Sequence, residues 1–255
     1  MQRANFLHYL PEELVTYMEH ITNLNRERNE EIITQARELN TLLSANNIKP
    51  IFLKGTGNLL EGLYEDIAER MLGDIDFIVS KDNYSKTIEV LTDNKYKTVS
   101  KLKYFYPSFK HHPRLKKRNG ISAVEIHKEL LKEKYALEFH YDIIHKEVQK
   151  LNEVTVLGFE DQLALSIIAK QINDDGLYYK NMALRNGYDV FLLSKKINTK
   201  DDFKFIEGTK GQVWCLVNIY GDLFCGHNTG TFIVNDNTVE KISDVLGVWN
   251  LKPIE

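Results

Sequence analysis

Two aspartates separated by one residue are the strongest chemical signal in this chain. Asp74 and Asp76 lie in the segment 73–79, and the residues that alternate with them toward its end are apolar. Successive side chains of a strand point to opposite faces, so both carboxylates are expected on one face. Neighbouring carboxylates repel each other, and a divalent cation between them relieves that repulsion. The spacing therefore predicts a strand that presents a pair of metal ligands.

A third acidic residue is expected on a later strand. The segment 121–127 alternates as a strand and places Glu125 opposite to its apolar neighbours. A second candidate strand, 136–144, carries Glu138 and Asp142 on one face. Glu125 is the first choice for the third carboxylate, and Glu138 and Asp142 are the alternatives.

A glycine-rich segment precedes the aspartates. The apolar run 51–53 predicts a buried strand, the sequence Lys-Gly-Thr-Gly at 54–57 predicts a tight turn, and leucines at helical spacing predict a helix over 58–64. Backbone amides of such a turn can hold phosphate oxygens. Two common phosphate-binding motifs are excluded, because Leu60 stands where a dinucleotide-binding motif needs glycine and Gly62 is not followed by the Lys-Ser/Thr of a P-loop.

Together these residues indicate phosphoryl transfer. Asp74 and Asp76 would hold Mg²⁺ against a triphosphate, and the third carboxylate would complete a second metal site that activates an acceptor hydroxyl. The sequence contains no HExxH helix, GxSxG nucleophile elbow or zinc ribbon.

The order of the motifs resembles the nucleotidyltransferase superfamily with the polymerase-beta-type fold. More narrowly, it is similar to a bacterial family of uncharacterised nucleotidyltransferases, over about residues 30–195. The motifs that carry the resemblance are Leu53-Lys54-Gly55-Thr56, Leu63-Tyr64, Arg70, Asp74-Ile75-Asp76 and Glu125-Ile126-His127.

The resemblance implies roles for individual residues and a cofactor. Two Mg²⁺ ions, or Mn²⁺, would be bound, and His127 is interpreted as an orienting or packing residue rather than a ligand. The implied catalytic and metal-binding residues are Asp74, Asp76 and Glu125, and the implied nucleotide-binding residues are Lys54, Gly55, Thr56 and Arg70.

The expected reaction moves a nucleoside monophosphate from an NTP, with ATP as one candidate, to a hydroxyl or phosphate acceptor and releases pyrophosphate. A small-molecule acceptor is the first hypothesis. The alternatives are a toxin-like enzyme that modifies tRNA or protein, a phosphotransferase that releases a nucleoside diphosphate, and a non-catalytic binding module. The sequence names neither the base nor the acceptor.

Composition limits the partners. The 255 residues are 43% apolar and carry a net charge of −3, which gives no general attraction to nucleic acid or to anionic membranes. Any polyanion must therefore bind a local patch. The basic segment from Lys110 to Arg118 is interpreted either as a solvated hairpin tip or as an electropositive lip for an anionic acceptor.

The expected architecture is α/β, with a mixed sheet flanked by helices. Residues 1–150 are predicted to form the nucleotidyltransferase core, including N-terminal helices within 5–47, and residues 151–255 a mainly helical second domain. The N-terminus lacks the apolar core of a signal peptide, and no apolar stretch approaches the roughly 20 residues that span a bilayer. A cytoplasmic protein is expected, with Cys215 and Cys225 as reduced thiols.

Overall fold

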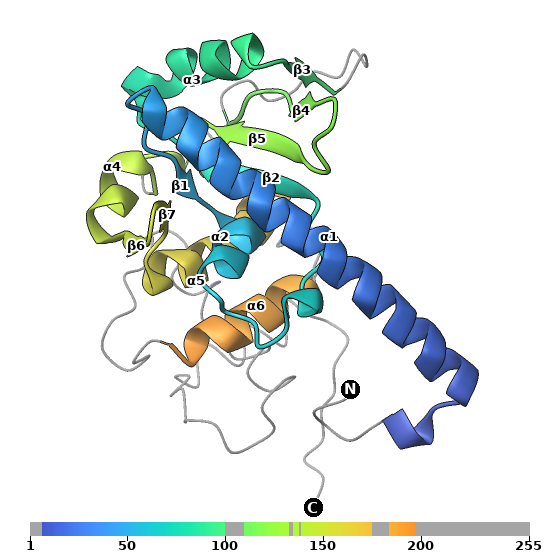
Figure 1. Ribbon diagram of the computed structural model, residues 1–255. Coiled ribbons are helices and arrows are strands. Elements are labelled where there is room, and N and C mark those ends of the chain that lie inside the picture. The colour runs from blue at the N-terminus through green and yellow to red at the C-terminus, as the bar shows by residue number, and fades with distance from the viewer. Residues whose placement is uncertain (1–6, 100–109, 133–134, 138, 175–183, 197–255) are drawn as a thin grey trace, which may run out of the picture. The chain divides into compact units, whose positions relative to one another are not determined.

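A computed structural model of the protein describes residues 7–99, 110–132, 135–137, 139–174 and 184–196 (Figure 1). The chain divides into two compact units. The first consists of Met1–Glu129 and Tyr141–Gly158, and the second of Leu130–His140 and Phe159–Glu255. Glu138, the two cysteines and much of the predicted second domain lie outside the described residues. The predicted division at residue 150 stays a prediction.

The first unit is built on a seven-stranded mixed sheet with the strand order β3-β4-β5-β2-β1-β7-β6. Strand β2 runs parallel to β5 and β1 runs parallel to β7, whereas the other neighbours are antiparallel. The mixed α/β architecture predicted from the sequence is confirmed. The strands are β1 (Ile51–Phe52), β2 (Asp74–Ile78), β3 (Tyr96–Thr98), β4 (Leu115–Lys117), β5 (Ala123–His127), β6 (Gln149–Leu151) and β7 (Val154–Val156).

One long helix dominates the N-terminal part. The N-terminal helices predicted within 5–47 are observed as one long helix, α1 (Glu12–Ala45), preceded by the short turn at Leu7–Tyr9. Helix α3 (Lys81–Asp93) follows strand β2. Shorter helices complete the unit: α2 (Lys54–Leu60), α4 (Tyr141–Ile144), and the single turns η2 (Leu7–Tyr9), η3 (Ile67–Glu69) and η5 (His145–Glu147).

Amide side chains on α1 fix the backbone that leads into the sheet. Gln35 exchanges two hydrogen bonds with the backbone of Ser122, just before β5, at 2.9 and 3.1 Å. Asn29 donates to the carbonyl of Arg70, shortly before β2, at 2.7 Å. Buried backbone groups need hydrogen-bond partners, and α1 supplies them just before β2 and β5. These bonds therefore position the start of both strands. Further α1 donors of the same kind are Asn25, which bonds Ala68, and Asn40, which bonds Glu153.

The glycine-rich segment was predicted wrongly as a turn before a helix over 58–64. It is instead the first turn of helix α2, which begins at Lys54 and ends at Leu60. The glycines serve close packing: a Cβ at Gly57 would lie 2.9 Å from the carbonyl oxygen of Phe52, and one at Gly55 would lie 2.5 Å from Leu72 Cδ2. Tertiary packing against β1 and β2 therefore overrides the weak helix propensity of glycine.

Two other interpretations are corrected. The segment 136–144 contains no strand among its described residues, and Asp142 lies in the first turn of helix α4. Phe139 is buried, but Leu137 and Ile143 on the same alternation are 84% and 43% exposed, so these apolar residues do not form one buried face. The hairpin-tip interpretation of the basic segment holds only for its end, where the turn at Arg118 and Asn119 joins β4 to β5. Leu115–Lys117 instead form β4, which pairs with both β3 and β5.

The second unit is helical where it is described. Its elements are α5 (Phe159–Ile168), the π-helical segment η6 (Ala169–Asn173) and α6 (Leu184–Ser194). The Asn173 side chain accepts from the Lys132 amide at 3.0 Å and donates to the Leu130 carbonyl at 2.8 Å. In the described part of the chain, no helix combines the length and the apolar character needed to cross a membrane.

The Gly57→Ala substitution should destabilise the protein by about 1–3 kcal/mol, because the added methyl group meets backbone that can move only if α2 shifts away from β1. Chemical denaturation would measure the effect. Gly73→Ala is the matched control, since a Cβ at Gly73 meets nothing within 4 Å. Equal stability of the two variants would show that the close contact of α2 with β1 is not required.

Candidate active site

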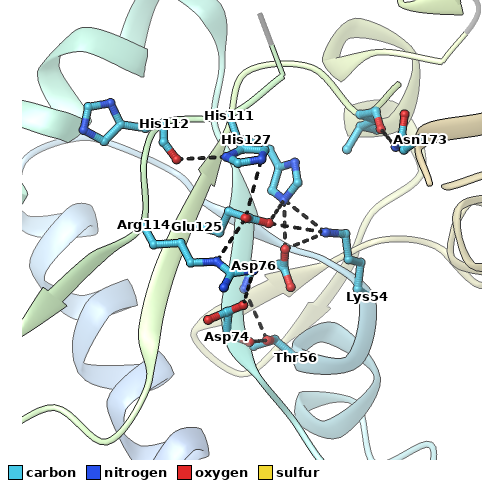
Figure 2. Close-up of polar contacts among 11 residues, drawn as sticks. Lys54, Thr56, Asp74, Asp76, His111, His112, Arg114, Glu125, His127 and Asn173 are labelled. Carbon is cyan, nitrogen blue, oxygen red and sulfur yellow. Dashed lines mark hydrogen bonds and ion pairs between the residues drawn. The ribbon is translucent and has the colours of Figure 1, made fainter. Parts of the chain in front are cut away.

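The site is built on the parallel pairing of β2 with β5 (Figure 2). Asp76 lies directly beside Glu125 in the register, and Asp74 lies two residues earlier on the same face of β2. Ile75, which lies between the two aspartates on β2, points to the other face of the sheet. There Ile75 and Val124 of β5 are fully buried. The predicted carboxylate pair and third acid are therefore brought together by two neighbouring strands.

Lys54 joins this group from the start of α2. Its Nζ lies 2.6 Å from Oδ1 of Asp76 and 3.6 Å from Oε2 of Glu125. The Lys54 side chain is 31% exposed, and the two carboxylate side chains are 14% and 10% exposed. At such low exposure the charges are screened less than at the surface, so the lysine offsets much of the repulsion between the acids.

His127 is the most buried member, with a side chain only 1% exposed. Its Nε2 lies 2.8 Å from Oδ1 of Asp76 and 3.2 Å from Oε2 of Glu125. Both carboxylate oxygens lie closer to Nε2 than the Lys54 ammonium does at 3.3 Å, which favours the tautomer that carries the proton on Nε2. Its Nδ1 has no hydrogen-bond partner among the described residues, although histidines that bind metals usually donate from their second nitrogen. The geometry thus favours a histidine that orients both carboxylates.

Arg114 approaches the carboxylates from the other side and comes from the basic segment. Its guanidinium lies 3.0 Å from Oδ2 of Asp74 and 3.5 Å from Oε1 of Glu125. His111 lies nearby, with Nε2 3.6 Å from the same Glu125 oxygen. Sequence reasoning missed both residues as members of the site. The available signal was the basic segment itself, which contains both residues and was interpreted in the alternative as an electropositive lip.

Thr56 and Gly55 lie beneath the site, on the first turn of α2. The Thr56 hydroxyl contacts the carbonyl of Asp74 at 3.2 Å and the amide of Asp76 at 3.4 Å, and the residue is 2% exposed. It therefore fixes the β2 backbone between the two aspartates. Gly55 is buried against Arg70.

Arg70 is 8% exposed and donates to the carbonyl of Met71 at 2.9 Å. The roles of Lys54, Gly55, Thr56 and Arg70 in nucleotide binding stay predictions.

The pKa values of Glu125 and Asp74 are shifted in opposite directions. Burial disfavours the charged form of Glu125, but the hydrogen bond from His127 and the charge of Lys54 outweigh it, so the pKa of Glu125 lies well below its ordinary value. Burial raises the pKa of Asp74, and Arg114 only partly offsets this effect while Asp76 and Glu125 add to it. Glu125 is therefore held as a carboxylate anion.

The donor set fits a divalent cation. Asp76, Glu125 and His127 each offer a ligand atom, and these atoms lie within 4.8 Å of one another. Carboxylate oxygens suit Mg²⁺ and Mn²⁺, whereas an imidazole nitrogen suits later transition metals. With His127 engaged in orienting its neighbours, the carboxylates are the stronger candidates for ligands.

Comparison with known proteins agrees with this site. A family model described as "Uncharacterised nucleotidyltransferase" matches residues 1–209, well over half of the chain. The chain belongs to this nucleotidyltransferase family. The resemblance inferred from the Lys-Gly, Asp-x-Asp and acid-x-His motifs is thus confirmed. A search of curated proteins finds no match. In this member of the family, Asp74, Asp76 and Glu125 converge on one face of the sheet.

The low pKa of Glu125 predicts a specific pH dependence. A carboxyl group whose pKa is lowered by folding adds stability above its ordinary pKa of 4.5 and loses that contribution as the pH falls through lower values. The wild type should therefore lose more free energy of unfolding below this pH than Glu125→Gln does, by up to about 1.4 kcal/mol per pH unit. Urea denaturation across this range would measure the difference. Glu89→Gln, at an exposed position on α3, should keep the wild-type slope. An unchanged slope in Glu125→Gln would contradict the interpretation.

Proposed function

We propose that this nucleotidyltransferase moves a nucleoside monophosphate from an NTP to a hydroxyl or phosphate acceptor and releases pyrophosphate. The acceptor oxygen would form a bond to the α-phosphorus while the bond to the pyrophosphate oxygen breaks, and the acceptor proton would leave to solvent. We propose a small molecule as the acceptor. The core would be of the polymerase-beta type, and residues 151–255 would form a mainly helical second domain.

One observation carries the proposal: three carboxylates share one face of two adjacent parallel strands in a chain of this family. Asp74, Asp76 and Glu125 would hold two Mg²⁺ ions, or Mn²⁺. Metal ions so held neutralise the developing charge on a triphosphate and lower the pKa of an acceptor hydroxyl.

The electrostatics of Glu125 bear on its role. A general base works best with a pKa near the operating pH, whereas the pKa of Glu125 is held far below it. Glu125 therefore suits the role of an anionic ligand better than that of a proton acceptor. Its two oxygens are oriented from opposite sides, Oε2 by His127 and Oε1 by Arg114.

A second candidate is transfer to a macromolecule, tRNA or protein. It is favoured by the position of the basic segment from Lys110 to Arg118, whose Arg114 contacts the site carboxylates directly. Lys116 and Lys117 of β4 are exposed next to it. An anionic acceptor bound there would reach the site, and its modification would fall steeply as salt increases.

The decisive experiment is calorimetric titration of each of the four NTPs, with Mg²⁺ and with EDTA. We expect metal-dependent binding of at least one NTP to the wild type and a loss of roughly tenfold or more in the Asp74→Asn/Asp76→Asn variant. The control is Asp82→Asn/Asp93→Asn, which removes the same charge from exposed positions on α3 and should bind like the wild type.

The NTP that binds is then offered, labelled on the α-phosphate or on the γ-phosphate, to a panel of acceptors. Transfer of the α-label with pyrophosphate release supports the proposal, and transfer of the γ-label indicates a phosphotransferase. Absence of binding by any NTP would overturn the proposal in favour of a non-catalytic binding module.

A further inference from the structure

Lys54 has an uncommon backbone conformation for its residue type. It is the first residue of α2, and its φ of 52° lies in the left-handed region. Residues other than glycine rarely adopt this region, and those that do are held there by their surroundings, often at functional sites. The conformation directs the side chain toward the carboxylates on β2 and β5 (Figure 2).

The Lys54 ammonium lies among the atoms of the candidate metal site. Its Nζ is 2.6 Å from Oδ1 of Asp76 and 3.6 Å from Oε2 of Glu125. It also lies 3.3 Å from Nε2 of His127. These three residues are the ones whose ligand atoms cluster within 4.8 Å. A divalent cation on the same carboxylates would come close to Nζ, and like charges at such separations repel.

We propose that Lys54 is a tethered competitor for the metal site, so that its ammonium group and a divalent cation exclude each other from Asp76 and Glu125. This inference rests on the proposed function, because it takes these two carboxylates as metal ligands. Arg114 does not compete in the same way. It contacts Asp74 and the other oxygen of Glu125, Oε1, and leaves Oε2 to Lys54.

The competition couples metal binding to nucleotide binding. A free cation must displace the ammonium without offering it another anion. A cation that arrives with a nucleoside triphosphate also supplies phosphate oxygens to which the ammonium can move. The Lys54 side chain is 31% exposed and has a long flexible stem, so this movement requires no change in the core. Lys54 thereby favours the metal–triphosphate complex over the free metal.

The test is calorimetric titration of Mn²⁺ into the protein without nucleotide. Lys54→Met keeps the apolar stem and removes the charge, and it should bind Mn²⁺ on the order of tenfold more tightly than the wild type. Lys81→Met is the matched control. It removes a lysine of the same unit that pairs with Glu129 at 2.9 Å, and its Mn²⁺ affinity should equal that of the wild type.

A second measurement uses the wild type alone and does not depend on the folding of a variant. Acetylation of lysines, followed by mass spectrometry, reports how accessible each amine is. Saturating Mn²⁺ should increase the acetylation rate of Lys54 several-fold and leave that of Lys81 unchanged.

The outcomes separate this inference from the proposed function. If the wild type binds Mn²⁺, but Lys54→Met binds it no more tightly and the reactivity of Lys54 does not rise, the competition is wrong while the metal site stands. If neither the wild type nor Lys54→Met binds Mn²⁺, the carboxylates are not a metal site, and both proposals are overturned.

Discussion

The side-by-side placement of Asp76 and Glu125 on parallel strands is the constraint on which the rest of the site depends. Two unit charges 4 Å apart interact by about 4 kcal/mol at an effective dielectric constant of 20, a large share of the stability of a typical domain. Lys54, Arg114 and His127 offset this repulsion. They come from α2, from the residue before β4 and from β5 itself. The charge balance is therefore complete only when these elements have assembled.

The apolar residues on the opposite face of the same two strands keep the carboxylates out of the core. A slip of one residue between β2 and β5 would turn Ile75 and Phe77 toward the polar face and bury the aspartates, so the register is strongly specified. The amide side chains of α1 support the register, because they fix the backbone just before each of the two strands. Core packing and site geometry are thus set by the same pairing.

The parts that were predicted correctly depend on local regularity. Alternation over a few residues was enough to find β2, β5 and the face that carries Asp74, Asp76 and Glu125. The start of α2 was missed because Lys-Gly-Thr-Gly has low helix propensity, whereas its close packing against Phe52 and Leu72 involves residues outside the segment. Alternation also misled at 136–144, where large apolar side chains are exposed. The contacts of Lys54 and Arg114 join segments far apart in the sequence, so no local pattern contains them.

Lys54 shows how local strain and long-range charge are balanced at this site. A left-handed backbone at a non-glycine residue costs on the order of 1 kcal/mol or more, whereas a hydrogen bond to a charged group contributes roughly 1.5–3 kcal/mol. The 2.6 Å contact with Asp76 is therefore of the size that offsets this strain. A ligand that draws the ammonium away removes that compensation and leaves the strain in the first turn of α2. Because Thr56 of the same turn contacts the β2 backbone between the aspartates, any adjustment of α2 directly reaches the strand that carries Asp74 and Asp76.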